Sequence, residues 1–313
     1  MILVLRALGV GDLATAVPAL RGLRRAFGGD ELRLAAPAWL APLVELVGAV
    51  DRLVPIDGLT PVRWPPPSPR LAVNLHGRGP QSHQLLSAAG PDRLLAFACP
   101  AAGHHHGPVW RQDEHEVDRW CRLLGWQGIP ADPADLALQA PGGADLAGCT
   151  IVHPGAKAAA RRWPARRYAT VAGELATAGH RVVVTGSAAE RDLAALVAAG
   201  AGLPGEAMLA GATDVGQLAR LVAGARLVIC GDTGVAHLAT GYGTPSVVLF
   251  GPNPPHWWGP PPGRPWHRAL WHGPVRRTPA QDTAAPHPAL ARITVGEVLH
   301  AADEVAGADP RRR

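Results

Sequence analysis

The sequence predicts an α/β protein built from two doubly wound parallel sheets, and three observations lead to this expectation. Short apolar runs of strand length alternate with segments of helical periodicity through most of the 313 residues, a pattern typical of parallel sheets. The alternation stops in a Pro- and Gly-rich stretch at 129–149 and then starts again. Polar residues follow several of the apolar runs, where the carboxyl ends of parallel strands border a ligand crevice.

The first half of the chain contains the elements of one such sheet. Apolar runs of strand length lie at 1–8, 31–36, 71–79 and 93–98. Helical periodicity covers 13–27, 39–47 and 113–126. The Pro- and His-rich stretches 55–69 and 100–112 are expected to be loops. Acidic residues gather at the start of the helix 113–126, where the helix dipole favours them, so we interpret it as a capped surface helix.

The second half repeats this alternation. Expected strands lie at 150–156, 181–186, 226–231 and 245–251. Expected helices lie at 166–179, 190–200, 214–225, 234–243 and 294–306. The chain is Pro- and Trp-rich after Gly259, and the tail 308–313 is expected to fray. We therefore expect an N-terminal Rossmann-like domain at 1–146 and a C-terminal one at 147–313.

Composition narrows the class of protein. Hydrophobic residues make up 47% of the chain and charged residues 18%, so a sizeable core is expected and disorder is not. The net charge is +5, but Lys157 is the only lysine, and the basic residues are not interleaved with stacking aromatic residues. We therefore expect no nucleic-acid partner. The four cysteines are widely scattered, which is typical of reduced thiols in a cytoplasmic protein.

Signals for export, membrane insertion or metal binding are weak. The first residues lack the pattern of a secretory signal, and no apolar run reaches the ~18 residues that a membrane span requires. We expect a cytoplasmic protein without a transmembrane segment, and peripheral contact with a membrane stays open. His104, His105 and His106 share one loop, but three adjacent residues rarely converge on one ion, so no metal site is expected.

The stretch GVGDLA at residues 9–14 fits the G-x-G-x-x-A spacing of a dinucleotide site. Such a site has a second anchor, an acid ~20 residues further on at the end of the second strand. That strand here ends in Leu-Ala-Ala-Pro, so the anchor is missing. A tight turn between strand and helix explains the spacing without a ligand. Asp12 is then either a helix cap or a residue that takes part in the reaction.

The stretch DTGVAHLA at 232–239 has the features of an anion site. Asp232 ends a predicted strand, and Thr233 and Gly234 begin a helix with His237 one turn along. Backbone N–H groups and the helix dipole favour an anion at such a position.

The loop HPGAKAAARRWPARRY at 153–168 offers a second group of phosphate-facing residues. Lys157, Arg161 and Arg162 could neutralise charge there, and Pro164 favours the start of a helix. A basic loop of this kind is also typical of a solvated surface. Together with the stretch at 232–239, however, it indicates a diphosphate ligand.

These residues resemble glycosyltransferase family 9, the ADP-heptose:lipopolysaccharide heptosyltransferase group. The resemblance runs in order through LGVGDLATAVPAL, HPGA with RRWPARRY, VVVTGSAAERD, DTGVAHLA, GTPSVVLFGPNPP and ITVGEVLHAA. The Asp-Thr-Gly-x-x-His element is the most specific of them. Membership implies a GT-B fold, in which two Rossmann-like domains face each other across a cleft. The N-terminal domain would bind the acceptor and the C-terminal domain the nucleotide sugar.

The resemblance also implies an inverting transfer that needs neither a metal ion nor another cofactor, and the chain contains no D-x-D sequence. Asp12 would be the general base that takes the proton of the acceptor hydroxyl. Asp232 would hold the hydroxyls of the sugar. The departing diphosphate would be held by Thr233, Gly234 and His237.

Three further positions follow from the resemblance. Glu190 would accept from the ribose hydroxyls, although it also fits a first-turn acid on a surface helix. The backbone near Thr213 would meet the base, while Thr213 itself also fits an ordinary N-cap. Arg161 stands where the family usually has lysine, and its larger forked guanidinium could change the donor geometry.

The resemblance leaves alternatives open. A nucleotide-sugar epimerase or a dehydrogenase could use a similar double Rossmann frame, and a non-catalytic nucleotide-sugar-binding protein could have the same loops. ADP-linked heptose is the favoured donor, and the acceptor is a small-molecule or lipid-linked glycan. The loop at 74–84 offers His76, Arg78 and His83 but no long basic cluster for an anionic acceptor. The sequence does not name the sugar, the acceptor or the oligomeric state.

Overall fold

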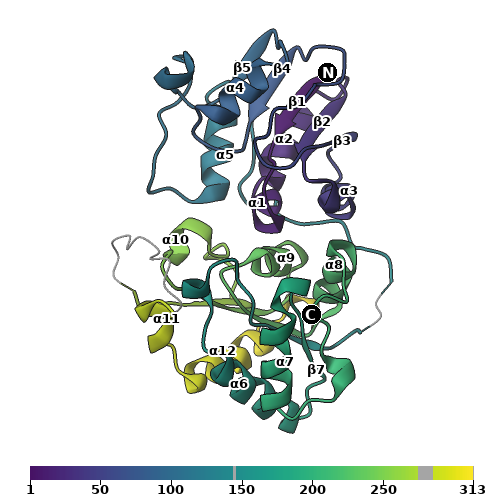
Figure 1. Ribbon diagram of the computed structural model, residues 1–313, viewed down its shortest axis with the longest axis vertical. Coiled ribbons are helices and arrows are strands. Elements are labelled where there is room, and N and C mark those ends of the chain that lie inside the picture. The colour runs from purple at the N-terminus through teal and green to yellow at the C-terminus, as the bar shows by residue number, and fades with distance from the viewer. Residues whose placement is uncertain (144–145, 274–284, 313) are drawn as a thin grey trace. The chain divides into compact units, whose positions relative to one another are not determined.

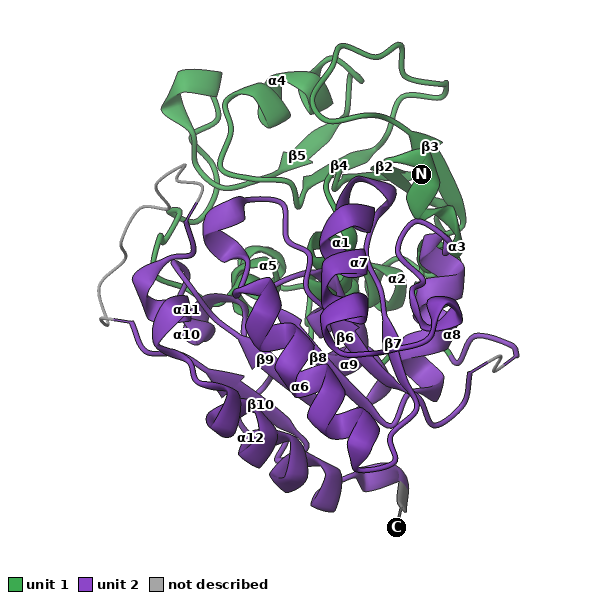
Figure 2. Cartoon of the chain, turned by 60° about the horizontal axis from the view of Figure 1, so that its bottom comes forward, with its two compact units in different colours: residues 1–139 green, residues 140–313 purple. Residues whose placement is uncertain are grey.

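The computed structural model describes residues 1–143, 146–273 and 285–312. The chain forms two compact units, unit 1 at Met1–Gln139 and unit 2 at Ala140–Arg313, which are coloured separately in Figure 2. Each unit contains a five-stranded sheet in which every strand pair is parallel. The predicted α/β class with two parallel sheets is confirmed.

The sheet of unit 1 has the strand order β3-β2-β1-β4-β5. Its strands are β1 (Ile2–Leu5), β2 (Leu32–Ala36), β3 (Arg52–Pro55), β4 (Leu71–Asn74) and β5 (Arg93–Leu95). Its helices are α1 (Val10–Thr15), α2 (Val17–Ala26), α3 (Ala41–Val47), α4 (Gln81–Ser87) and α5 (Glu116–Gly125). The winding direction reverses between β1 and β4. Ligands of open α/β sheets bind at the carboxyl ends of the strands beside such a switch point.

The helices α2 and α5 of unit 1 pack against each other. Gly22 of α2 lies close to the chain that follows α5. A β-carbon built on Gly22 would lie 2.8 Å from the carbonyl oxygen of Pro130 and 3.0 Å from the β-carbon of Ala131. The absence of a side chain at Gly22 therefore lets this segment lie directly on the helix.

The sheet of unit 2 has the order β10-β9-β8-β6-β7. Its strands are β6 (Thr150–His153), β7 (Val182–Val184), β8 (Leu227–Gly231), β9 (Ser246–Leu249) and β10 (His267–Leu270). Its helices are α6 (Ala165–Thr177), α7 (Arg191–Gly200), α8 (Val215–Gly224), α9 (Gly234–Tyr242), α10 (Pro255–Trp258), α11 (Pro288–Arg292) and α12 (Val295–Gly307). Figure 1 shows α8 and α9 on one face of this sheet and α6, α7 and α12 on the other. The switch point lies between β6 and β8.

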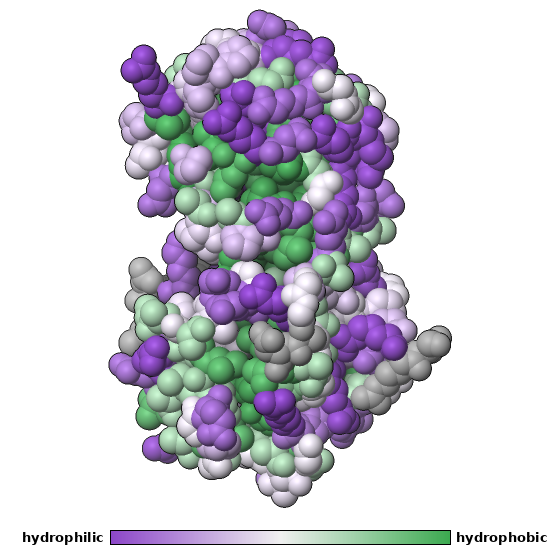
Figure 3. Space-filling view, turned by 90° about the vertical axis from the view of Figure 1, so that its right-hand side faces the viewer, coloured by the Kyte–Doolittle hydropathy of each residue, from purple (hydrophilic) through white to green (hydrophobic). Residues whose placement is uncertain are grey.

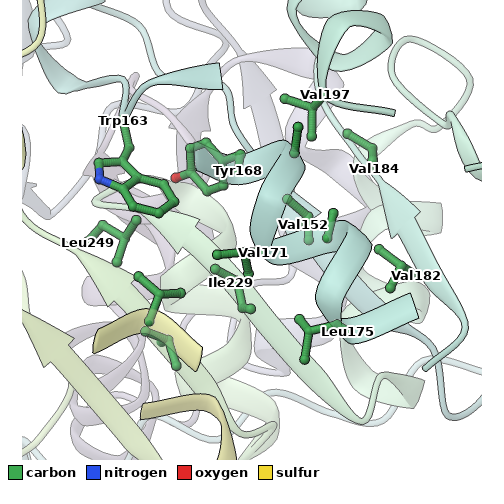
Figure 4. Close-up of a cluster of buried hydrophobic side chains, with 14 of the residues drawn as sticks. Val152, Trp163, Tyr168, Val171, Leu175, Val182, Val184, Val197, Ile229 and Leu249 are labelled. Atoms are coloured by element: carbon green, nitrogen blue, oxygen red, sulfur yellow. The ribbon is translucent and has the colours of Figure 1, made fainter. Parts of the chain in front are cut away.

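The core of unit 2 fixes the loop that follows β6 (Figure 4). Trp163, at the end of this loop, is buried and meets the ring of Tyr168 edge-on, with 5.0 Å between the ring centroids. Its indole Nε1 donates to the carbonyl oxygen of Ile293 (3.1 Å). A large aromatic side chain with a satisfied polar atom anchors the chain strongly. The core of unit 2 therefore holds the end of the loop that carries Arg161.

Several elements differ from the sequence-based expectation. The edge strands β3 and β10 and the helix α4 were not predicted, because each combines few buried residues with Arg, His or Gln. The expected helix 13–27 is two helices that meet at Ala16. Pro18 lacks the N–H that would continue the hydrogen-bonding of α1 into α2.

The expectation that the tail 308–313 frays is wrong for residues 308–312, and Arg313 lies outside the described residues. Pro310–Arg312 form a turn of 3-10 helix. The guanidinium of Arg311 donates to Asp309 and to the carbonyl oxygens of Ala223 (3.2 Å) and Ala225 (2.9 Å). These bonds attach the end of the described chain to α8 and the residue after it.

One face of the molecule, shown in Figure 3, mixes green hydrophobic surface with purple hydrophilic side chains. Four large hydrophobic side chains of the described residues are more than half exposed, namely Trp39, Val109, Trp126 and Leu196. Every helix within the described ranges is too short or too polar to span a bilayer.

The close approach at Gly22 predicts an effect on stability. Gly22→Ala gains helix propensity, but its methyl group would collide with the carbonyl oxygen of Pro130. This oxygen belongs to the backbone and cannot rotate away as the end of a side chain could. We expect the free energy of unfolding to fall by about 1–2 kcal/mol. Denaturation in urea measures this change.

Gly125→Ala is the matched control, because Gly125 is also helical and a β-carbon there meets nothing within 4 Å. Its unfolding free energy should be unchanged or higher by up to about 1 kcal/mol. Equal shifts in the two variants would contradict the role given to Gly22.

Candidate functional site

Arg6 directly follows β1 and lies at the switch point of unit 1. Its side chain is completely buried. The guanidinium donates from Nε to the carbonyl oxygen of Asp12 (2.9 Å) and from its Nη atoms to the Leu75 carbonyl, Thr15 Oγ1 (3.2 Å) and Glu116 Oε1 (2.9 Å). A buried guanidinium requires such partners, because water no longer solvates its charge. Arg6 therefore joins β1, α1, the end of β4 and α5.

Asp12 lies in the first turn of α1, which begins three residues before the expected helix 13–27, so Asp12 is not the N-cap residue. The N-cap residue is Gly9, and its backbone N donates to Asp12 Oδ2 (3.1 Å). Asp12 Oδ1 lies 3.5 Å from Nη2 of Arg6, and the side chain of Asp12 is 29% exposed. One carboxylate oxygen thus caps the helix while the other makes a long contact. The two interpretations of Asp12 are compatible, because each uses a different oxygen.

Glu116 corrects the interpretation of α5 as a plain surface helix. It begins this helix, but it is only 5% exposed. Its carboxylate accepts from Arg6, from the indole Nε1 of Trp120 (3.0 Å) and from Arg119. Sequence analysis missed Glu116 and Arg6. An arginine at the end of an apolar strand was the available signal, since a buried cation requires a buried carboxylate.

His76 lies two residues after β4, on the other side of the switch point. Its backbone N donates to Asn74 Oδ1 (2.9 Å). Burial lowers the pKa of His76 to about 4, and the charge of Arg6 acts in the same direction, whereas Asp12 acts against it. The imidazole is therefore neutral at neutral pH. Its Nδ1 is buried and makes no hydrogen bond within the described part of the chain.

In unit 2, the structure brings Arg161 and Asp232 together at the switch point. Asp232 directly follows β8 and is 6% exposed, and Arg161 lies in the loop after β6. Arg161 Nη2 donates to Asp232 Oδ2 (2.6 Å) and to the backbone oxygen of the same residue. Asn253 Nδ2 lies 3.4 Å from the same Oδ2. This ion pair fixes the orientation of the Asp232 carboxylate.

The N-terminus of α9 follows immediately. Thr233 is the N-cap residue, and its side chain makes no capping hydrogen bond. Gly234 is the first helical residue and presents no side chain. His237 lies one turn along, where its ring meets Trp258 edge-on with 5.9 Å between centroids. Helix N–H groups without a side-chain cap, together with the helix dipole, favour an anion at this end.

Glu190 lies in the turn between β7 and α7. Its Oε2 accepts from the backbone N and the Oγ of Ser187, both at 2.8 Å. Burial acts to raise the pKa of Glu190, but these bonds and the nearby cations lower it below the usual value. A β-carbon on Gly155 would lie 2.3 Å from the Glu190 carboxyl group. The glycine after β6 therefore provides the space that this carboxylate fills.

Thr213 is not the N-cap of α8. The cap is Asp214, which accepts from Gln217 N (2.7 Å), while Gln217 Oε1 accepts from Asp214 N (2.8 Å). The D-x-x-Q spacing forms a reciprocal capping box, which satisfies two helix donors at once and takes precedence over a lone threonine. Thr213 lies half-buried just before it.

Possible metal ligands do not converge. Within residues 1–143, 146–273 and 285–312, no three His, Cys, Asp or Glu side chains are placed to hold an ion. His104 instead packs edge-on against His83, with 5.4 Å between the ring centroids.

The two Rossmann-like units match the pair of domains from which GT-B glycosyltransferases are built. The family model of glycosyltransferase family 9 (heptosyltransferase) matches residues 111–280, more than half of the chain. The chain belongs to this family and is a glycosyltransferase.

Curated relatives agree with this assignment, and solved structures share the fold. Lipopolysaccharide heptosyltransferase 2 of Escherichia coli K12 is 25% identical over 300 residues, covering 81% of this chain and 83% of the relative. The structure of E. coli ADP-heptose lps heptosyltransferase II has a TM-score of 0.78 at 23% identity and covers 97% of this chain and 98% of its own. E. coli heptosyltransferase WaaC with ADP has a TM-score of 0.68 at 17% identity and covers 99% of both chains.

The neutral His76 predicts a pH dependence of stability. Its pKa is about 4 in the folded chain against 6.5 for an ordinary histidine. Between these values the unfolded chain binds up to one proton more, so the contribution of neutral His76 is present above pH 6.5 and lost as the pH falls toward 4. The unfolding free energy of the wild type should therefore fall as the pH decreases from 6.5 to 4. In His76→Gln it should fall less steeply, because the difference in bound protons between the unfolded and the folded chain is smaller by up to about one.

Urea denaturation at several pH values measures this slope. Leu196→Gln is the control, because the side chain of Leu196 is 67% exposed and neither residue titrates, so the slope should be unchanged. A His76→Gln slope equal to that of the wild type would refute the assignment.

Proposed function

We propose that this glycosyltransferase moves a sugar, with heptose favoured, from an ADP-linked donor to an acceptor hydroxyl. The transfer inverts the anomeric carbon and needs no metal ion. Unit 1 binds the acceptor and unit 2 binds the donor. The observation that carries the proposal is the arrangement at the switch point of unit 2, where Arg161, Asp232 and the N-terminus of α9 meet.

The donor roles follow from the chemistry of these groups. The N–H groups of Thr233 and Gly234 and the side chain of His237 hold the diphosphate. Asp232 accepts from the sugar hydroxyls. Nη2 of Arg161 donates to Asp232 and its Nε is buried, so Nη1 is the atom that would meet the diphosphate. A lysine, with a single nitrogen, could not serve both partners in the same way.

The nucleoside is held by neighbouring loops of unit 2. The charged carboxylate of Glu190, whose pKa is lowered, suits the two hydroxyls of a ribose. The backbone beside Thr213 meets the base. Neither role needs a particular sugar, so the donor sugar is the less constrained part of the proposal.

Asp12 is the general base in this mechanism. Its Oδ1 takes the proton of the acceptor hydroxyl while the hydroxyl oxygen forms a bond to the anomeric carbon. The bond from that carbon to the diphosphate breaks on the opposite face, which inverts the configuration. The charge of the departing ADP is met by Arg161, His237 and the helix N–H groups, a preorganised set that can replace a metal ion.

The acceptor follows from the relatives, whose names give lipopolysaccharide as the molecule that they modify. A lipid-linked or smaller glycan is the corresponding acceptor here, with peripheral membrane contact. His83 is not available to it, because the ring is buried and bonds to Asn74 and to the Phe97 carbonyl. His76 and the exposed Arg78 are the remaining candidates of that loop.

Calorimetric titration in the presence of EDTA tests the donor. The panel is ADP, UDP, GDP, dTDP, ADP-heptose and NAD. We expect ADP to bind without metal, and ADP-heptose to bind more tightly because Asp232 gains the sugar hydroxyls. Binding of NAD alone, or of ADP only after a divalent metal ion is added, would contradict the proposal.

Asp12→Asn tests the base. The amide keeps an oxygen that can cap Gly9 but cannot take a proton. We expect transfer to a lipopolysaccharide-type acceptor to fall by roughly 10²–10⁴-fold, with ADP affinity unchanged because the donor binds unit 2. Turnover equal to that of the wild type would leave Asp12 with a structural role only.

A further inference from the structure

Two buried charged residues near Asp12, Arg6 and Glu116, take no part in the proposed reaction. The side chain of Arg6 is fully buried and that of Glu116 is 7% exposed. Removing both charges from water is costly, and an apolar pair of similar size would pack at least as well. Their presence beside the base therefore requires an explanation other than stability.

The guanidinium of Arg6 lies between two carboxylates at unequal distances. Its Nη2 is 2.9 Å from Glu116 Oε1 and 3.5 Å from Asp12 Oδ1. Glu116 is held in place by Trp120 and Arg119, and the Arg6 guanidinium lies over the Trp120 ring, 4.7 Å from its centroid. The cation is thus paired with Glu116, and its contact to the carboxylate of Asp12 is the longer one, although its Nε also donates to the backbone oxygen of Asp12.

This inequality leaves one oxygen of Asp12 open. Oδ2 accepts the capping bond from Gly9. Among the described residues, the contact to Oδ1 is the long one from Arg6. We infer that Glu116 is a positioning residue, which holds the Arg6 guanidinium away from Asp12 and keeps Oδ1 available to the acceptor hydroxyl. This inference rests on the proposed function of Asp12 as the base.

Loss of the Glu116 charge would redirect Arg6. The carboxylates that the described residues bring within ion-pair distance of Arg6 are those of Asp12 and Glu116. A buried guanidinium without Glu116 would close on Asp12 Oδ1 and form a charge-assisted hydrogen bond. His76, from the loop after β4, also faces this pair, but it is neutral at neutral pH. The balance of charge around Asp12 is therefore set by Arg6 and Glu116.

Glu116→Gln tests the inference with the full-length protein, ADP-heptose and a lipopolysaccharide-type acceptor. We expect kcat to fall by about 10- to 100-fold, the range of one hydrogen bond to a charged group. The acid limb of the kcat–pH profile should move toward lower pH, because the guanidinium then favours the charged form of the base. ADP affinity, measured by calorimetry, should not change.

Glu114→Gln is the matched control. Glu114 lies two residues earlier and its side chain is 10% exposed, but it pairs with Arg122 (2.8 Å between Oε2 and Nη2). Within the described residues its carboxylate contacts Arg122 and, at 3.8 Å, Arg119, and it forms no hydrogen bond or ion pair with Arg6 or Asp12. We expect its kcat, its acid limb and its ADP affinity to match the wild type.

A double variant, Arg6→Gln with Glu116→Gln, keeps the test decisive if the single variant does not fold. It removes the cation that would close on Asp12, so its kcat should exceed that of Glu116→Gln. If Glu116→Gln does not fold, the kcat of the double variant should lie within about tenfold of the wild-type value. Near-ultraviolet circular dichroism checks the fold of each variant. A loss of all activity in a folded double variant would overturn the inference.

The other outcomes separate this inference from the proposed function. No transfer by the wild type, or full transfer by Asp12→Asn, is a failure of the proposed function. Wild-type transfer that Asp12→Asn abolishes, with kcat and acid limb unchanged in Glu116→Gln, overturns the role of Glu116 alone. An equal loss of kcat in Glu114→Gln and Glu116→Gln, without a shift of the acid limb in either, also overturns the role of Glu116. Destabilisation of α5 would then explain both variants.

Discussion

Parallel strands impose the constraint on which this molecule depends, because each strand must be followed by a crossover that returns the chain to the same starting edge. All carboxyl ends in a sheet therefore lie along one edge. The winding reverses once in each sheet, between β1 and β4 and between β6 and β8. The loops on either side of the reversal diverge and leave room for a ligand. Every residue proposed to act in transfer lies on the loops at these edges or in the first turn of the helix that follows.

A similar charge arrangement occurs at both reversals. In unit 1 the arginine after β1 meets Asp12 and Glu116, and in unit 2 the arginine in the loop after β6 meets Asp232. Buried ion pairs contribute little to stability, because desolvation offsets their attraction. They do fix the direction of the carboxylates that they bind, Glu116 in unit 1 and Asp232 in unit 2. In unit 1 the guanidinium bound to Glu116 stays 3.5 Å from the carboxylate of Asp12.

Local patterns predicted much of this molecule. The central strands were predictable because burial on both faces makes them continuous apolar runs, and the sequence after β8 correctly predicted that a helix begins at Gly234. The edge strands β3 and β10 were not predictable, because one face or one end of each stays exposed. Glu116 was missed for a different reason. Its partner is 110 residues away, and local spacing carries no information about such a pair.

The strand orders of the two sheets have a consequence for recombination. In unit 1 the first strand, β1, has the second and fourth strands of the chain as neighbours, whereas in unit 2 the first strand, β6, lies between the second and third strands of that unit. The halves are therefore different windings and not strand-for-strand copies. If a single strand–helix module were exchanged between the units, its strand would take a different position in the strand order of the receiving sheet. A crossover at the boundary between the units, near residues 139 and 140, would pass each sheet intact to a chimera.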